Sequence, residues 1–266
     1  MLKLDLKRAL FNRNTLTALL IGFAIAAFGI WESPIRMAMQ LANSTAADLT
    51  EENRMYLIGG MLNEVYLFDS SQWLYAFVIP FVGILPHAAS YFTDRKSNFS
   101  RQLIIRSNFK RYVKMKLVNV FLSGFLVSLA VSALTILFIY SINMENGARG
   151  IYYSTNFLND ISRNNFFAYV MIHAMLTAVL TGLVGLMGLA VSALVNHKVL
   201  IYIIPFLMVT LSRLFFTGTL LDLRMAHGYF TYWDITFNWV VFQLTLIAIV
   251  TVSVFLFTTW KKKEHI

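Results

Sequence analysis

Six long stretches of the chain contain no Asp, Glu or Lys, and this pattern constrains the fold more than any other feature of the sequence. They are residues 15–31, 73–92, 117–142, 166–195, 199–217 and 235–260. A helix of about 20 apolar residues is long enough to cross the hydrocarbon core of a membrane. Because lipid cannot pair open backbone groups, each stretch is expected to be a helix rather than a strand. The pattern predicts an all-α membrane protein with six transmembrane helices.

The composition excludes a soluble domain of this size. Only 13% of the 266 residues are charged, whereas about a quarter are charged in typical soluble domains. The longest interval outside the predicted spans is 32–72, and we expect it to contain a helix that begins near Thr50. Thr50 could cap that helix, and Glu51 and Glu52 suit its first turn. Residues 1–266 are therefore predicted to form a single transmembrane domain.

The basic residues are distributed unevenly between alternate connections. Of the 22 Lys and Arg residues, 16 lie in the N-terminal arm, in the connections after the second and fourth spans, or in the C-terminal tail. The positive-inside rule places these segments, and both termini, in the cytoplasm. All five Trp residues lie at or near span ends, as is usual at membrane interfaces. We predict a multi-pass protein of the plasma (cytoplasmic) membrane that contacts lipids rather than nucleic acid.

The sequence offers little for catalysis. It has no cysteine, which excludes thiol catalysis and thiolate metal sites, and no phosphate-binding Gly-x-x-x-x-Gly-Lys loop. His87 and His173 have no evident carboxylate partner within a span, and no serine nucleophile elbow accompanies them. Arg213 is the only charged residue within a predicted span, and Asp222 or Asp234 could pair with it. We therefore expect no enzyme activity, and we assign no catalytic, cofactor-binding or metal-binding residue.

The segment between the second and third spans, residues 93–116, is the most informative connection. It carries an apolar cluster between basic flanks, and Asp94 and Ser97 could start a short helix there. Phe99 and Leu103 are four residues apart and would share one helix face. Such a face could dock on a partner protein, or the helix could lie on anionic lipid with its basic residues in the headgroups. The residues alone leave both interpretations open.

This segment resembles the permease subunits of type-2 ABC exporters. The resemblance consists of an acidic–basic pair after a span, a short apolar helix, and a basic-aromatic run into the next span. It is carried by Asp94, Arg95, Lys96, Leu103, Ile104, Ile105, Ser107, Tyr112 and Lys116. In that family the segment is the coupling helix that docks in a groove of the ATPase subunit. The match covers residues 91–116 closely, and the six-span layout with both ends inside fits the whole chain.

The resemblance implies an ATP-driven exporter in which this chain has no cofactor of its own. Two permease chains, identical or different, would form the translocation pathway, and separate ATPase subunits would bind ATP and Mg. The residues expected to contact the ATPase subunit are Asp94, Arg95, Lys96, Phe99, Leu103, Ile104, Ile105, Arg106, Tyr112 and Lys116. The 23 Phe residues suit an amphiphilic or lipophilic cargo.

The resemblance also implies two short helices outside the spans. Leu2, Leu6 and Leu10 form one ridge of a candidate interfacial helix, although the segment could equally be a plain basic anchor. Residues 213–238 are half apolar and are expected to re-enter the membrane, or else to pack over the helix ends. The chain departs from the family in its long first external connection.

The fourth span carries small residues at helical spacing. They are Ala174, Ala178, Gly182, Gly185 and Gly188. Small residues let helices approach closely, so we expect this face to pack against another helix of the bundle or across a dimer interface.

Other functions stay open. An ATP-independent six-helix carrier or channel is one, although ion coupling usually needs ionisable groups at mid-membrane and the predicted spans almost lack them. An intramembrane enzyme and a membrane immunity or sensor protein that binds a ligand through its external loop are further alternatives.

Overall fold

The protein is helical throughout the part of the chain that the structure describes. The computed structural model describes residues 2–45, 49–97, 99–142, 158–216 and 237–263, and these contain no strand. The helices are α1 (Leu2–Leu10), α2 (Arg13–Ile30), the π-helix η1 (Trp31–Ile35), α3 (Arg36–Ala42), α4 (Glu51–Met61), α5 (Glu64–Ile84), α6 (Ser90–Lys96), α7 (Phe99–Ser107), α8 (Phe109–Ile142), α9 (Asn159–Asn164), α10 (Phe166–Leu194), α11 (Lys198–Phe216) and α12 (Phe237–Lys263). The all-α prediction is confirmed for these residues.

Five helical stretches in the described ranges are long and apolar enough to cross a membrane. They are Arg13–Ala42, Glu64–Ile84, Phe109–Ile142, Phe166–Leu194 and Asn238–Lys261. The apolar helix at the place of the predicted fifth span, Lys198–Ser212, is shorter. This architecture is that of a membrane-embedded protein. The predicted fifth span, residues 199–217, is not among the five stretches, so a total of six spans stays a prediction. Most of the predicted re-entrant segment, including Asp222 and Asp234, lies outside the described residues.

The second membrane-spanning helix begins earlier than the sequence pattern predicts. We expected residues 73–92, whereas α5 runs from Glu64 to Ile84. Asn63 caps the helix by accepting a hydrogen bond from the Val65 amide at 2.9 Å. The polar residues after Glu64 do not stop the helix, because residues 69–72 are buried inside the bundle rather than exposed to lipid. For this reason, the prediction from charge-free runs placed the start of the helix at residue 73, nine residues after its true start at Glu64.

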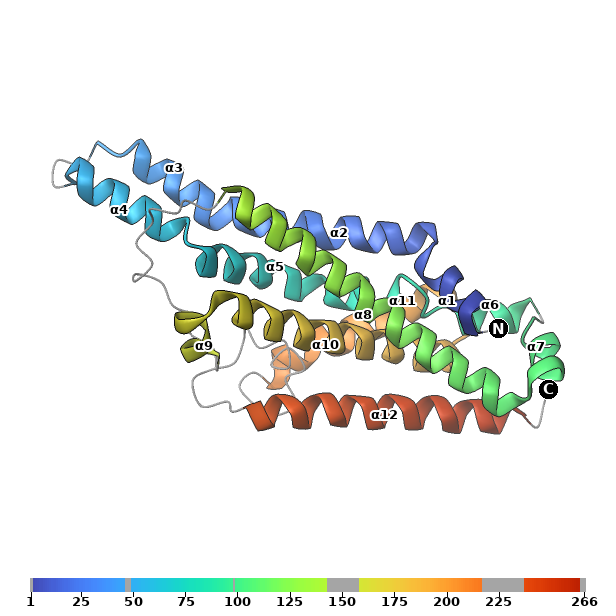
Figure 1. Ribbon diagram of the computed structural model, residues 1–266. Coiled ribbons are helices and arrows are strands. Elements are labelled where there is room, and N and C mark those ends of the chain that lie inside the picture. Colours follow the sequence, from blue (N-terminus) through green and yellow to red (C-terminus); the bar gives the residue numbers. More distant parts are fainter. Residues whose placement is uncertain (1, 46–48, 98, 143–157, 217–236, 264–266) are drawn as a thin grey trace.

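The predicted external interval 32–72 is mostly helical. The second segment of this interval, α4, begins at Glu51, and the Thr50 hydroxyl accepts from the Asn53 amide at 3.3 Å, which confirms the predicted cap. The first segment continues α2 through η1 into α3, giving 30 residues in one stretch. A helix of that length spans about 45 Å, more than the roughly 30 Å of a hydrocarbon core. Figure 1 shows α3 and α4 side by side at the end of the molecule far from α1.

The α10 helix is the centre of the core, and its small residues contact other helices of the same chain. Ala174 and Ala178 are buried, and a Cβ added to Gly188 would lie 2.9 Å from the Cβ of Ala88. A Cβ on Gly182 would lie 2.8 Å from the Phe121 ring of α8. We expected this face to pack either against another helix of the bundle or across a dimer interface. In the structure it packs against helices of the bundle.

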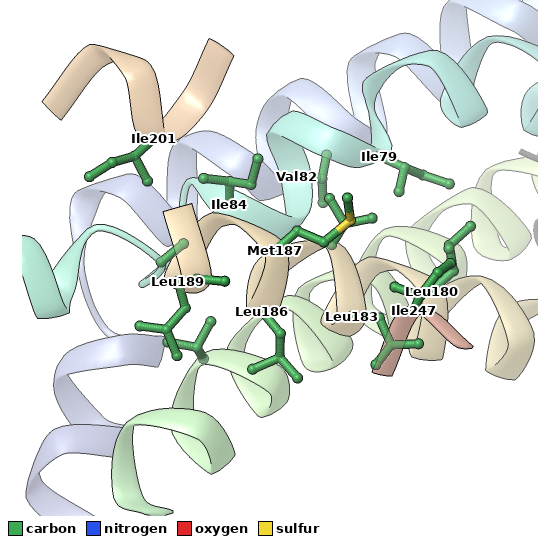
Figure 2. Packing of buried hydrophobic residues seen from close by; sticks show 14 of the residues in the cluster. Ile79, Val82, Ile84, Leu180, Leu183, Leu186, Met187, Leu189, Ile201 and Ile247 are labelled. Atoms are coloured by element: carbon green, nitrogen blue, oxygen red, sulfur yellow. The ribbon is translucent and has the colours of Figure 1, made fainter. Parts of the chain in front are cut away.

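Larger apolar side chains fill the space on either side of these close contacts. Figure 2 shows Val82 and Ile84 of α5 gathered with Met187 of α10, all of them buried. Close packing of this kind fixes the distance between the helices and makes the bundle resistant to deformation. The core therefore provides a rigid support for the polar groups at its two ends.

The two ends of the bundle differ in composition. The α1 helix and the last turns of α12 lie at the same end as α6 and α7 (Figure 1). We call this end the basic end and define it as α1, the turn of residues 85–89, α6, α7 and the first three turns of α8. It carries most of the cationic residues of the described chain. Its position on the cytoplasmic face stays a prediction.

Candidate functional site at the basic end

A buried lysine joins two acidic residues from different helices at the basic end. The side chain of Lys116, on α8, is 1% exposed, and its Nζ lies 2.8 Å from Asp94 Oδ2 on α6. The same Nζ lies 3.4 Å from Asp5 Oδ1 on α1. The Tyr112 hydroxyl donates to Asp94 Oδ2 at 3.3 Å. One cation therefore holds three helices together.

Asp5 has further partners besides Lys116. Asn119 Nδ2 donates to Asp5 Oδ2 at 2.9 Å, and His87 Nε2 lies 3.4 Å from the same oxygen. Burial raises the pKa of the Asp5 carboxyl, but the contacts with His87, Lys116 and Asn119 outweigh it and hold the pKa well below its usual value. Asp5 therefore lies in its site as a carboxylate at neutral pH. We call Asp5, His87, Asp94, Tyr112, Lys116 and Asn119 the ion cluster.

The lowered pKa of Asp5 predicts a loss of stability in acid. A group whose folded pKa is depressed stabilises the fold above its unfolded pKa and loses that contribution as the pH falls through the folded value. We expect unfolding of the detergent-solubilised protein to become easier below about pH 4, where the unfolded carboxyl takes up its proton. Asp5→Asn should unfold more easily at neutral pH and show a weaker acid dependence between about pH 5 and pH 2. Equal acid dependence of the variant and the wild type would contradict this assignment.

The α6 helix is also fixed to the end of α10. Arg95 donates to the carbonyl oxygens of Ala193 at 3.3 Å and Val195 at 2.9 Å. These are carbonyls at a helix C-terminus, where the helix dipole favours a cation. Arg95 thus connects α6 to the central helix of the core.

The α7 helix packs on its neighbours through part of its surface only. The guanidinium of Arg8, from α1, lies 5.8 Å from the centre of the Phe99 ring, and Ile104 packs against the main core. Ile105 is 85% exposed. Lys110, at the start of α8, is also exposed. Of the described α7 side chains, Ile105 and Gln102 are exposed, so the free surface of this helix combines one apolar and one polar residue.

The ten residues predicted to contact an ATPase subunit fall into distinct groups. Asp94, Tyr112 and Lys116 belong to the ion cluster, Arg95 binds α10, and Ile104 packs inward. Phe99 is half-buried under Arg8. Lys96 and Ile105 are exposed. The side chains of Leu103 and Arg106 lie outside the described residues. Only Lys96 and Ile105 of the described set are therefore exposed to a partner, which is a smaller surface than predicted. The other described residues hold α6, α7 and α8 in place.

Sequence reasoning missed Asp5, Asn12 and Asn119, and it found no carboxylate partner for His87, which the structure places 3.4 Å from Asp5. Asn12 Nδ2 donates to the Pro86 carbonyl at 3.1 Å and so ties the start of α2 to the turn after α5. The one available signal was Asp5 itself, an acidic residue within a strongly basic arm. Its partner Lys116 is far away in the sequence, so no local pattern could indicate the contact.

A second polar cluster lies between α5 and α10, away from the basic end. Tyr169 donates a short hydrogen bond to Asp69, and both side chains are buried. The rings of His173 and Tyr169 lie 6.0 Å apart, and the Thr177 hydroxyl is 3.3 Å from His173 Nδ1. We expected no carboxylate within a span near His173, because the predicted second span began after Asp69. The earlier start of α5 corrects that expectation.

Comparisons of the chain with protein-family models, curated proteins and solved structures found no match. Within the described ranges, no group of three His, Asp or Glu side chains is arranged to hold a metal ion. The functional argument therefore depends on the geometry of the two clusters and on the exposed face of α7.

Proposed function

We propose that the chain is the membrane-spanning permease subunit of an ATP-driven ABC exporter, coupled to separate ATPase subunits through α6 and α7. The observation that carries the proposal is the exposed Ile105 on a short helix whose supporting residues are buried and ion-paired. An apolar residue with 85% exposure at the basic end suits contact with another protein. A partner with an apolar groove and an acidic rim would match it.

The surrounding contacts suit transmission of movement. The α6 helix is bound to α8 through Lys116 and Asp94, and to α10 through Arg95. A push on α7 would therefore reach helices that cross the whole bundle, rather than being absorbed in a loose connection. In such an exporter, two permease chains line the pathway and the ATPase subunits supply ATP hydrolysis. An amphiphilic or lipophilic cargo stays our expectation.

Ile105→Asp tests the proposed contact. We expect an ABC ATPase to co-purify with the wild-type chain from its native membrane, and the aspartate to weaken this association at least tenfold, as at a central interface residue. The measurement is the amount of ATPase subunit, identified by mass spectrometry, per permease chain, together with the ATPase activity of the complex. Met55→Asp is the matched control, because Met55 is also exposed but lies on α4 at the opposite end.

Two results would reject the proposal. One is the absence of any ATPase subunit from the purified wild-type complex. The other is an I105D chain that holds as much ATPase, with the same activity, as the M55D chain. Both variants replace an exposed side chain, so loss of folding is not expected to obscure the comparison.

An ATP-independent carrier driven by protons is a second candidate. It is favoured by the second polar cluster, which contains Asp69, Tyr169, His173 and Thr177 and is called the Asp69 cluster from here on. Ionisable residues within membrane helices are costly and usually have a functional role. Asp69 is buried in α5 and bonded to Tyr169 of α10, so a change in its protonation would alter a contact between two central helices.

Asp69→Asn separates this candidate from the exporter. For a proton-driven carrier, we expect the wild-type protein in vesicles to move protons across the membrane together with its substrate. In the asparagine variant this proton flux should fall at least tenfold. Asp160→Asn is the control, because Asp160 is exposed on α9. The readout is a pH-sensitive dye inside the vesicles. Equal proton flux in the two variants would reject the carrier.

A further inference from the structure

The junction of α1, α2 and α8 contains an apolar groove that neither proposed function uses. Its volume is about 550 Å³, within the roughly 300–1,000 Å³ of ligand pockets in proteins. Leu16, Leu19, Leu126 and Ala130 form its walls, with Phe11 and Arg13 at the end next to α1. The groove therefore has an apolar interior and one cationic end.

The groove opens toward the surface that membrane helices present to lipid. Phe11 is 80% exposed and Leu16 is 56% exposed, so neither is covered by another part of the described chain. The stretches that line the groove, Arg13–Ala42 and Phe109–Ile142, are both apolar enough to cross a membrane. An occupant would therefore enter from the bilayer.

The positive charge of Arg13 at one end of the groove requires an anionic group on the occupant. Arg13 is exposed and forms no ion pair with any described residue. The acidic residue nearest in sequence, Asp5, is occupied by Lys116 and Asn119. Arg13 lies at the first turn of α2, where the helix dipole also favours an anion.

We propose that this groove binds an anionic phospholipid, with one acyl chain between α2 and α8 and the phosphate at Arg13. Lys7 and Arg8 on the neighbouring α1 are exposed and add positive charge on the headgroup side. The lipid would cover the junction between α1 and α2. The site is independent of any ATPase subunit and goes beyond the proposed function.

Native mass spectrometry of the full chain tests the site. The purified protein is mixed with phosphatidylglycerol or with phosphatidylcholine that carries the same acyl chains. We expect one phosphatidylglycerol per chain to be retained in preference to phosphatidylcholine. Arg13→Gln should reduce that preference about fivefold, the factor that corresponds to roughly 1 kcal/mol per cationic side chain. Ala130→Trp should fill the groove and abolish retention of both lipids.

Arg36→Gln is the matched control, since it removes an exposed arginine at the opposite end and should leave the lipid preference unchanged. Equal retention of the two lipids by the wild type, or an R13Q variant that behaves like R36Q, would overturn the proposal. A dimeric wild type and a monomeric A130W variant that retain the same amount of lipid would also overturn it. The groove would then hold a second copy of the chain instead of a lipid. If A130W fails to fold, the comparison of R13Q with R36Q still decides the question.

Discussion

Replacing Lys116 with methionine is expected to destabilise the protein by about 3–5 kcal/mol. The substitution keeps an unbranched side chain, one atom shorter than that of lysine, and removes the charge. Asp5 and Asp94 would then lie mostly buried without the cation that they share. Removing one partner of a buried ion pair is costly, because the remaining charge keeps its desolvation penalty and loses the attraction that offset it.

Lys114→Met is the matched control for this experiment. Lys114 lies on the same helix and is exposed, so its replacement should change the unfolding free energy by no more than about 0.5 kcal/mol. The measurement is equilibrium unfolding of both variants in the same detergent micelles. A K116M variant as stable as K114M would show that the ion cluster contributes little to stability.

A double variant adds a sharper test. Asp94→Asn in the Lys116→Met background removes one of the two uncompensated carboxylates, so part of the lost stability should return. The single variant Asp94→Asn should be less harmful than Lys116→Met, because Lys116 keeps Asp5 as a partner. Residues in one network are coupled, and a simple sum of the two single effects would contradict the shared contact.

The sequence predicted the helices well because each prediction required only local information. Apolar runs between charges indicated where the chain can cross a membrane, and Thr50 followed by Glu51 and Glu52 indicated the start of α4. The predicted fifth span is not among the five stretches long enough to cross a membrane, and the second exception is α5. Its first turns contain Asp69 and Gln72, which are buried against other helices, so the rule that polar residues end a span did not apply. A pattern read along the chain cannot distinguish a polar residue that faces lipid from one that faces a neighbouring helix.

The candidate site was predicted in part. The segment from Asp94 to Lys116 contains residues that the structure brings together at the basic end. The sequence could not show which of these side chains are buried and which are exposed. Lys116 pairs with Asp5 across 111 positions of the chain. Phe99, predicted as an exposed docking residue, is half-buried under Arg8 from α1. Both contacts depend on where α1 lies, and the uneven apolar pattern of the first ten residues does not determine that position.

Gly185→Val is expected to destabilise the protein by about 2–3 kcal/mol, the upper part of the range for overpacked cores. A Cβ at Gly185 would lie 2.8 Å from the carbonyl oxygen of Gly83, closer than real Cβ contacts allow. That oxygen belongs to the backbone of α5 and cannot move aside as a flexible side chain could. The α5 and α10 helices would have to separate, which would loosen the contact between Asp69 and Tyr169 as well.

Ala133→Val is the control, since Ala133 is exposed on α8 and gains similar volume without a neighbour to displace. Unfolding in detergent gives the stability of both variants, and the proton-flux assay of the Asp69 cluster gives a second readout for G185V. Valine itself is a better helix former than glycine, by a few tenths of a kcal/mol, so any net loss in G185V understates the cost of separating the helices. Equal stability of G185V and A133V would mean that the two helices are not in close contact through their glycines, and the rigid core that supports both ends of the bundle would have to be reconsidered.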